Sequence, residues 1–410
     1  MPHNPRWQRF IQAIDGRFVL TIYLVVMLVI SARVWFSPIQ KGNVYPVFAY
    51  SGRCWLEGLS PYNDPQYLFR YTPLSAAVMT PLALLPDHVG SLLWRWLAFA
   101  ALLGSTVYFH RRVIAPWCTF IRLPWLGLAM LPLVVSNLNN GQSNPFLLAL
   151  ILTALASVLA QRWNLAAACL AGAVYLKLYP IALALLLILL YPRELTVRFL
   201  VCFILGALLP YLMQNPSYVT EQYQTFFAYS FKDTRMTNIL EEGNRDMWNI
   251  LRRMHLPISL TMYRLIQLGS ALLLAGLTLW LRPWRREPRT ILLIGNLCLA
   301  WMLLMGPATE SATYHLLAAT LAADLLLAIS APNSGWSILV ILSYALQLLA
   351  GIAGWFSFAH GIQSLGVQPF ATLIWTTWLI HAAFDLVMRH HQVRACRRIA
   401  LPMVAHSLHP

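Results

Sequence analysis

A single lysine, Lys177, stands between two apolar stretches, 165–176 and 179–191, that are each too short to cross a bilayer unaided. An ionisable side chain at membrane depth costs about 2.5–3.5 kcal/mol on insertion scales unless it is paired or hydrated. A bound anion would offset that cost, and a compact ammonium group is a common partner of phosphate. The alternative is that the long side chain reaches up to the membrane interface. Lys177 is therefore a candidate phosphate ligand.

The run from Asn139 to Asn144 reads N-N-G-Q-S-N and carries more amides than a helix connection requires. Amides donate and accept hydrogen bonds without carrying charge, which suits the hydroxyl groups of a sugar. The alternative is structural, because Asn144 and Pro145 fit the N-cap and first-turn positions of the next helix. Asn140, Gln142 and Asn144 are the candidate sugar-binding residues.

Charged groups gather in other breaks between apolar stretches. One break reads G-N-R-D-M-W from position 243, and its Arg245, like Arg252 after it, could hold a phosphate through two parallel hydrogen bonds. Another reads G-P-A-T-E and ends at Glu310, which either interacts with a helix dipole or belongs to a site.

The segment 37–72 is aromatic, interrupted by prolines, and contains Asp64. The apolar alternation after Tyr45 predicts an interfacial helix that ends at Gly58, in the position of a C-cap glycine. An ordinary belt of aromatic residues at the membrane surface would have the same composition.

Membrane helices must position these groups. Of the 410 residues, 59% are apolar and 10% are charged, which excludes a water-soluble globular protein. We expect an all-α polytopic transmembrane bundle of about 11–13 membrane segments, with a helical first outer loop. One membrane domain would cover 1–390, and a basic tail 391–410. The longer apolar stretches lie near 18–36, 88–109, 143–160, 199–213, 258–281, 290–305, 312–330, 336–358 and 366–388, and the shorter ones near 73–86, 124–135, 165–176 and 179–191.

The net charge of +15 indicates arginines at helix ends rather than a nucleic-acid partner. With the N-terminus inside, more than half of the 29 basic residues face the cytoplasm and most of the 14 acids face outward. The positive-inside rule then predicts a multi-pass protein of the inner membrane with both termini cytoplasmic and the polar breaks outside. Within the apolar stretches, Asp324 and Asp385 are expected to pair with helix-end arginines. No metal-binding motif is present, although the outer acids could hold a divalent cation.

The order of these motifs resembles glycosyltransferase family 87 of the GT-C superfamily. The resemblance implies a GT-C fold and transfer of a sugar, mannose or an arabinofuranose, from a polyprenyl-phosphate donor to a glycan or lipid acceptor outside the membrane. Lys177, Arg245 and Arg252 would hold the donor phosphate, and the amides would hold the sugar. The matching residues are Gly58, Pro61, Tyr62, Tyr71, Pro73, Leu74, Gly141, Gln142, Asn144, Gly172, Lys177, Pro180, Gly243, Asn244 and Arg252.

The resemblance also implies an acidic residue early in the first outer loop as catalytic base. This sequence has no acid at 43–45, where that residue would fall. We therefore assign the base to Asp64 or Glu310, and Glu57 is the next candidate.

Two alternatives to an active transferase are open. One is a transporter or lipid flippase, which would require charged residues deep inside several helices and an internal repeat. The other is a degenerate, non-catalytic family member.

Overall fold

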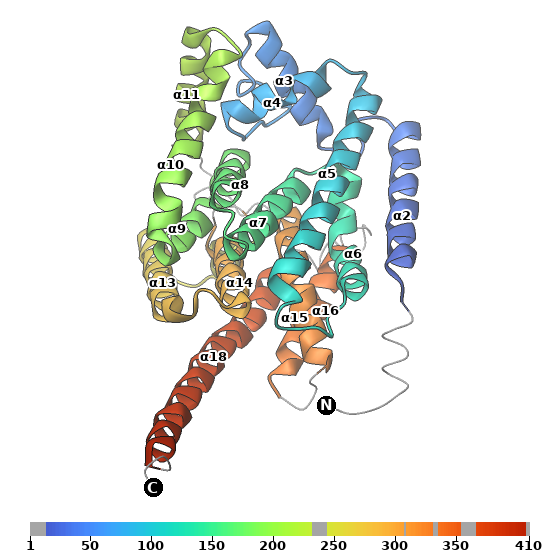
Figure 1. The fold of residues 1–410 in the computed structure, drawn as a ribbon. Helices are drawn as coiled ribbons and strands as arrows, with labels where there is room; N and C mark the ends of the chain where they lie inside the picture. The colour runs from blue at the N-terminus through green and yellow to red at the C-terminus, as the bar shows by residue number, and fades with distance from the viewer. Residues whose placement is uncertain (1–13, 232–243, 307–308, 331–334, 354–365, 407–410) are drawn as a thin grey trace.

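The computed structural model describes residues 14–231, 244–306, 309–330, 335–353 and 366–406. In these ranges the chain forms α-helices joined by short turns, with no strand (Figure 1). The all-α prediction is confirmed. The α-helices are α2 Gly16–Phe36, α3 Tyr45–Glu57, α4 Pro73–Ala83, α5 Asp87–Phe109, α6 Leu123–Asn140, α7 Asn144–Leu159, α8 Trp163–Leu176, α9 Ile181–Leu190, α10 Pro192–Leu208, α11 Pro216–Phe231, α12 Met247–Arg253, α13 Leu260–Leu281, α14 Pro288–Met305, α15 Ala318–Ser330, α16 Ser337–Ala353 and α18 Val367–His406.

Seven helical segments of the described chain are long and apolar enough to cross a membrane, and five further apolar helices are shorter. These twelve fall within the predicted range of segments, and the polytopic membrane architecture is confirmed. The long segments are Gly16–Phe36, Asp87–Ile114, Pro192–Leu212, Leu260–Trp284, Pro288–Met305, Ser311–Ser330 and Val367–Arg389. The shorter ones are α4, α7, α8, α9 and α16.

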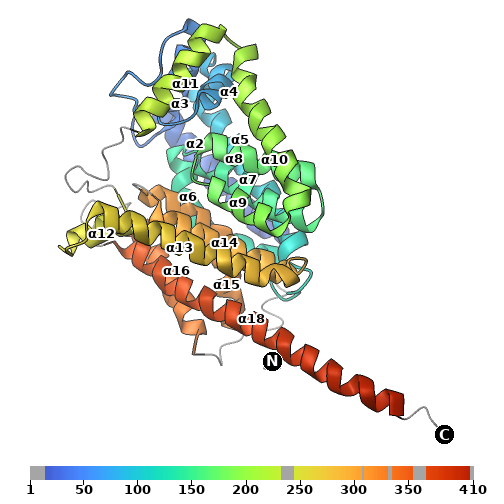
Figure 2. The same cartoon turned by 90° about the vertical axis from the view of Figure 1, so that its left-hand side faces the viewer.

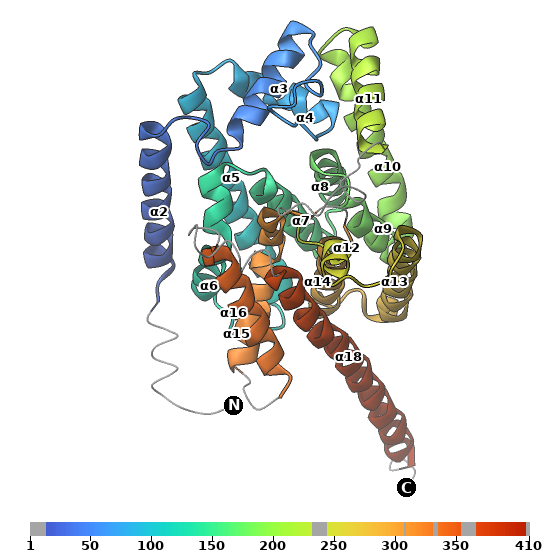
Figure 3. The same cartoon turned by 180° about the vertical axis from the view of Figure 1, so that it is seen from behind.

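Burial distinguishes central helices from peripheral ones. The spans at α14 and α15 are 78% and 72% buried inside the protein, whereas those at α10 and α13 are only 17% buried. The peripheral helices expose long rows of leucine and valine, as a lipid-facing surface requires. Figure 2 shows α13 lying across the outside of the bundle, and Figure 3 shows the same bundle from behind.

Helices α3, α4 and α11 form a cap at one end of the bundle, which is the upper end in Figure 1. The predicted helix of the first outer loop is confirmed, since α3 ends at Gly58 with φ +70°. The Thr72 hydroxyl at the start of α4 donates to the Tyr175 carbonyl at 2.7 Å, which joins the cap to the C-terminal end of α8. The cap therefore lies over the break between α8 and α9.

The segment 214–257 lies between the predicted apolar stretches 199–213 and 258–281, and its lack of an apolar run predicts a long outer loop. That prediction is wrong for much of its length. It contains α11 and α12. Tyr218 of α11 donates to the Leu59 carbonyl at 2.7 Å, and Gln214 donates to the Trp55 carbonyl at 2.8 Å. Tyrosines and glutamines replace the continuous apolar run of a membrane helix here, because α11 packs on α4 and on the end of α3 and is only partly buried.

The two intramembrane aspartates have different partners. Asp385 pairs with Arg289 at 3.5 Å and with Arg389 at 2.9 Å, as expected for helix-end arginines. The same expectation was wrong for Asp324, which accepts hydrogen bonds from Asn296 and Trp375 instead. The basic tail predicted after position 390 continues α18 to His406, and residues 407–410 lie outside the described part.

Candidate functional site beneath the cap

Lys177 is the C-cap residue of α8, and its backbone is extended, with φ −151° and ψ 139°. Pro180 precedes α9, so the chain leaves one helix and enters the next within four residues. The Lys177 Nζ atom donates a hydrogen bond to Asn144 Oδ1 at 2.8 Å. The predicted break at Lys177 is confirmed, and the ammonium group is directed at the start of α7.

Asn144 is 1% exposed and makes three side-chain hydrogen bonds. Its Nδ2 atom donates to Asn137 Oδ1 and to the Ala312 carbonyl, both at 2.9 Å. Because both amide protons have acceptors, the oxygen must face Lys177. The predicted N-cap role was wrong by one position: Ser143 is the N-cap of α7, and Asn144 is already inside the helix.

Arg95 supports the amide-rich turn through hydrogen bonds, and nothing in the sequence indicated this role. Arg95 is 1% exposed, and its Nη2 atom donates to the Asn139 carbonyl at 2.9 Å and to Asn43 Oδ1 at 3.0 Å. Gly141 lies against the guanidinium with φ +65°, a conformation that favours glycine. Asn43, at the start of the segment where an acid was sought, thus helps to hold the turn.

Glu310 interacts electrostatically with the phenols of Tyr71 and Tyr179. Tyr71 lies within hydrogen-bond distance of the Ser143 hydroxyl, at 3.1 Å. Burial and the Glu310 charge raise the pKa of Tyr71 to about 12, although the Ser143 hydrogen bond acts in the opposite direction. Burial also raises the pKa of Tyr179 well above its ordinary value, with smaller contributions from Tyr71 and Glu310. The Glu310 carboxylate therefore acts on both phenols, while Glu310 itself is exposed.

The segment that contains Arg245 pairs with the segment that contains Glu310. Asn244 and Glu310 form an antiparallel bridge, and the Arg245 amide donates to the Thr309 carbonyl at 2.5 Å. Asp246 caps α12 through the Asn249 amide at 2.8 Å and also accepts from the Thr309 amide at 3.3 Å. This pairing brings two sequence motifs more than sixty residues apart to one place. Gly243, Pro307 and Ala308 of these motifs lie outside the described residues.

The other predicted site residues lie around this cluster. Arg252 lies on α12 with its guanidinium 6.0 Å from the Trp248 ring centre. The Asn140 carbonyl accepts from the Val44 amide at 2.8 Å, and the Gln142 amide donates to the Asn137 carbonyl at 3.0 Å. Both amide side chains are half-buried in the turn.

Asp64 has a different setting. Its carboxylate accepts from the Gln66 amide at 2.8 Å, within the segment that joins α3 to α4. Among the described contacts of Asp64, none reaches Lys177 or Asn144. The structure therefore brings together Lys177, Asn144, the Arg245 backbone and Glu310, and it leaves Asp64 in the cap. In the described part of the chain, no three histidine, cysteine, aspartate or glutamate side chains gather as a metal site would require.

The fold and this cluster define a polytopic helical membrane protein with cationic and amide groups collected beneath a cap at one end of its bundle. The model of glycosyltransferase family 87 matches residues 69–307, which is more than half of the chain. The chain belongs to this family. The matched region includes Tyr71, Asn144, Lys177 and Arg245, but it begins after Asp64 and ends before Glu310.

Part of the chain is also similar to a curated mannosyltransferase. The chain is 33% identical over 146 residues to the catalytic subunit of GPI alpha-1,4-mannosyltransferase I from Danio rerio. The aligned part covers 34% of this chain and 35% of that protein. The chain therefore spans about a third of the length of the relative it matches.

Proposed function

We propose that this membrane glycosyltransferase moves a sugar, of the mannose or arabinofuranose type, from a polyprenyl-phosphate donor to a glycan or lipid acceptor. The observation that carries the proposal is the Lys177–Asn144 hydrogen bond of 2.8 Å, because Asn144 also donates to the Ala312 carbonyl, two residues after the exposed Glu310. An ammonium group and a carboxylate beside one polar turn are the groups that sugar transfer from a phosphate requires.

Lys177 is assigned to the phosphate of the donor. It replaces the hydration of the anion with a fixed positive charge and stabilises the phosphate as it leaves. Leu178, next to Lys177, and Ile181, the first residue of α9, are 45% and 42% exposed. Apolar surface next to the ammonium group supports a ligand whose phosphate carries a long hydrocarbon chain, since the chain can stay in the bilayer while the phosphate reaches Lys177. Arg245 and Arg252 are assigned to the same phosphate, and Asn140, Gln142 and Asn144 to the sugar.

The reaction breaks one bond and forms one. An acceptor hydroxyl attacks the anomeric carbon of the sugar, and the bond from that carbon to the phosphate oxygen breaks. The polyprenyl phosphate leaves with the bonding electrons, and a carboxylate takes the acceptor proton. Glu310 is favoured as this base because it lies with Tyr71 and Tyr179 at the cluster, whereas Asp64 is engaged in the cap. Asp246 is buried at the same cluster, where it accepts from the Asn249 and Thr309 amides, so the exposed Glu310 is preferred to it. No step is assigned to a divalent cation.

The cap end of the bundle is proposed to face away from the cytoplasm. The arginines of the break before α6, of the α9–α10 junction and of the turn before α14 lie at the opposite end (Figure 1). Helix α2 begins at that same end, and α18 runs out from it (Figures 1 and 3). This distribution supports a multi-pass protein of an inner membrane with both termini cytoplasmic and sugar transfer on the outer face.

Binding of the leaving group tests the proposal. Purified protein in lipid nanodiscs is titrated with a polyprenyl phosphate, and Lys177→Met is compared with Lys41→Met, which removes an exposed lysine. We expect Lys177→Met to weaken binding by about tenfold or more, as expected for loss of a charge-assisted hydrogen bond, and Lys41→Met to have no effect. Equal binding by all three proteins would refute the phosphate role of Lys177.

Transfer separates the enzyme from its alternatives. Radiolabelled polyprenyl-phosphate mannose is supplied to proteoliposomes that contain membrane lipids as acceptors, and glycolipid products are separated. Label in a new glycolipid that is lost in Lys177→Met supports the transferase. Movement of the intact donor across the bilayer without a new product would favour a transporter or flippase, and neither result would favour a degenerate family member.

A further inference from the structure

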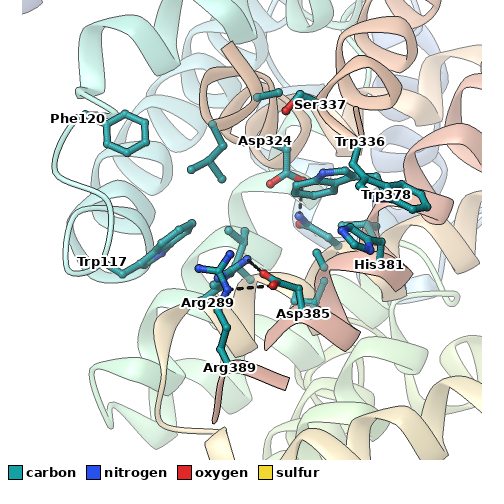
Figure 4. Close-up of a pocket in the computed structure, with 17 residues that line it drawn as sticks. Trp117, Phe120, Arg289, Asp324, Trp336, Ser337, Trp378, His381, Asp385 and Arg389 are labelled. Carbon is teal, nitrogen blue, oxygen red and sulfur yellow. Dashed lines mark hydrogen bonds and ion pairs between the residues drawn. The ribbon is translucent and has the colours of Figure 1, made fainter. Parts of the chain in front are cut away.

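A pocket of about 480 Å³ lies at the far end of α14 from Glu310 (Figure 4). Helix α14 has 18 residues, so its two ends are separated by about 27 Å at 1.5 Å per residue. The pocket surrounds the N-terminal half of α14, with walls from α15, α18, the segment at Trp117 and the start of α16. Its volume is typical of a small-molecule site, and the sugar-transfer proposal gives it no role.

The floor of the pocket is rich in hydrogen-bond acceptors. Asp324 and Asn296 line it, and each is 1% exposed. Asp324 Oδ2 accepts from Asn296 Nδ2 at 3.0 Å and from Trp375 Nε1 at 2.9 Å. Asn296 Oδ1 is buried with no hydrogen-bond partner among the described residues. A buried acceptor without a donor is costly, and a carboxylate at this depth is costly without a positive charge beside it. The floor therefore fits a ligand group that is positive and carries N–H donors.

The mouth of the pocket has the opposite charge. Arg289 and Arg389 both pair with Asp385, at 3.5 Å and 2.9 Å. Two guanidinium groups share one carboxylate, so the mouth is positive by one charge. Arginine has five N–H donors, and one carboxylate cannot satisfy both groups. Figure 4 shows these three side chains below Asp324, at one side of the cavity. The mouth therefore fits an anion of the phosphate type.

Aromatic rings form the walls between floor and mouth. Trp336 and His381 stack with ring centres 4.1 Å apart, and Trp378 lines the same wall. The Arg289 guanidinium lies 5.9 Å from the ring centre of Trp117 on the other side. Indole faces attract cations, so these walls favour an ammonium group on its way to the floor.

We propose that this pocket binds the headgroup of an ethanolamine phospholipid. The order of charges carries the inference. In such a lipid the ammonium group is terminal, the phosphate follows it, and the acyl chains come last. Entering headgroup first, the lipid places its ammonium group at Asp324 and Asn296 and its phosphate at Arg289 and Arg389. A primary ammonium group has three N–H donors and can satisfy Asn296 Oδ1, whereas a quaternary choline has none.

The test compares lipids that share a phosphate and differ in the terminal group. Delipidated protein in detergent is titrated with phosphatidylethanolamine, phosphatidylcholine and phosphatidylglycerol, and thermal stability and bound lipid, by native mass spectrometry, are measured. A lipid that binds the folded state raises the unfolding temperature. We expect phosphatidylethanolamine to bind at least about tenfold more tightly than the other two, as expected for loss of one charge-assisted interaction.

Asp324→Asn keeps the shape of the floor and removes its charge, and it should abolish the preference for ethanolamine. Arg289→Gln lies at the half-exposed mouth, where folding tolerates the change, and it should weaken all three lipids. Asp87→Asn is the matched control, because Asp87 pairs with Arg53 at the cap end, at 2.9 Å. It should leave the preference unchanged.

Equal binding of the three lipids to wild-type protein would overturn the proposal, as would an unchanged preference in Asp324→Asn. Glycerophosphoethanolamine carries the same headgroup without acyl chains and distinguishes a membrane lipid from a soluble ligand. It should compete only at higher concentration than the lipid, and equal potency would overturn the assignment to a lipid. None of these measurements depends on sugar transfer.

Discussion

Lys177 Nζ and Asn144 Oδ1 are joined by a hydrogen bond of 2.8 Å, although one residue ends α8 and the other lies in the first turn of α7. The amide nitrogen of Asn144 is held at the same time by Asn137 and by the Ala312 carbonyl. Asn144 thus connects three segments of the chain and fixes the direction of the lysine. A ligand that binds Lys177 meets an ammonium group that is already oriented, which lowers the ordering cost of binding.

Asn144→Asp tests this orientation. The substitution keeps the shape of the side chain but places a carboxylate oxygen against the Asn137 oxygen and the Ala312 carbonyl, and it gives Lys177 an ion pair that competes with phosphate. We expect sugar transfer to fall by about tenfold to a hundredfold, as one to two lost charged hydrogen bonds would cause, and the unfolding temperature to fall as well.

The control for that substitution is Asn164→Asp. Asn164 is exposed and accepts a hydrogen bond from Arg198, so an added negative charge there is tolerated. Full transfer activity in Asn144→Asp would show that the amide does not orient Lys177 for catalysis.

Glu310→Gln and Asp64→Asn distinguish the two candidate bases. Each substitution removes a carboxylate and keeps its shape, and Glu310 is exposed, so folding should be preserved. We expect Glu310→Gln to lower kcat by about 10²–10⁴-fold, the usual contribution of a general base. Asp64→Asn should stay near wild-type activity, because an asparagine oxygen can still accept from the Gln66 amide. The measurement is initial transfer rate at saturating donor, and the reverse pattern would assign the base to Asp64.

The raised pKa of Tyr71 predicts that the folded protein loses stability at high pH. Its pKa is raised from 10.0 to about 12 in the folded protein, chiefly by burial. A group whose folded pKa is raised stabilises the protein below its unfolded pKa, and this stabilisation is lost as the pH rises through the folded value. The stability that depends on the neutral phenol should therefore be complete below pH 10 and fall between pH 10 and pH 12.

The measurement is the difference in unfolding temperature between wild type and Tyr71→Phe from pH 7 to pH 12. At neutral pH Tyr71→Phe loses the contact with Ser143 at 3.1 Å, worth about 1 kcal/mol. The difference should be constant up to pH 10 and then shrink or change sign. A difference that stays constant up to pH 12 would contradict the raised pKa.

Gly141→Ala should disturb the amide turn. The φ of +65° is unfavourable for alanine, and the added Cβ would lie 3.0 Å from the Arg95 guanidinium. We expect a loss of about 1–2 kcal/mol from the backbone conformation alone, seen as a lower unfolding temperature, together with reduced transfer because the turn leads into Asn144.

Gly276→Ala is the matched control for Gly141. Gly276 lies within α13, and a Cβ there would have no atom within 4 Å. Alanine favours a helix over glycine by about 1 kcal/mol, so the unfolding temperature should stay the same or rise. Equal losses in both variants would show that the turn is not held by Arg95.

Apolar patterning predicted the helices because a membrane segment must satisfy its own backbone and face lipid or other helices along its whole length. The interruption at Lys177, the glycine after α3 and the helix that begins near Asn144 were visible for the same local reason. Helix α11 was missed because its Tyr and Gln side chains pack on the rest of the cap, at α4 and the end of α3, rather than on lipid. Such a helix has no continuous apolar run for the sequence to reveal.

The site required the tertiary structure. The types of residue at Lys177, Asn144 and Glu310 indicated chemistry, but nothing in the sequence indicated that the Asn144 amide would hold Lys177. Asn144 and Ala312 are 168 positions apart and meet only because α7 packs against the turn that begins at Ser311. In the sequence, Arg95 is one arginine within an apolar helix. Only the tertiary structure shows that it donates to the Asn139 carbonyl of the amide-rich turn.

Helix hydrogen bonding and apolar burial depend on the local composition of the chain. The sequence by itself therefore determined the helices, their breaks and the membrane class. Which helix ends meet is decided by the packing of the whole bundle. That packing alone placed Glu310 with Tyr71 and Tyr179, left Asp64 in the cap, and gave Asp324 neutral partners where an arginine was expected, because a side chain takes its partners from whichever helices surround it.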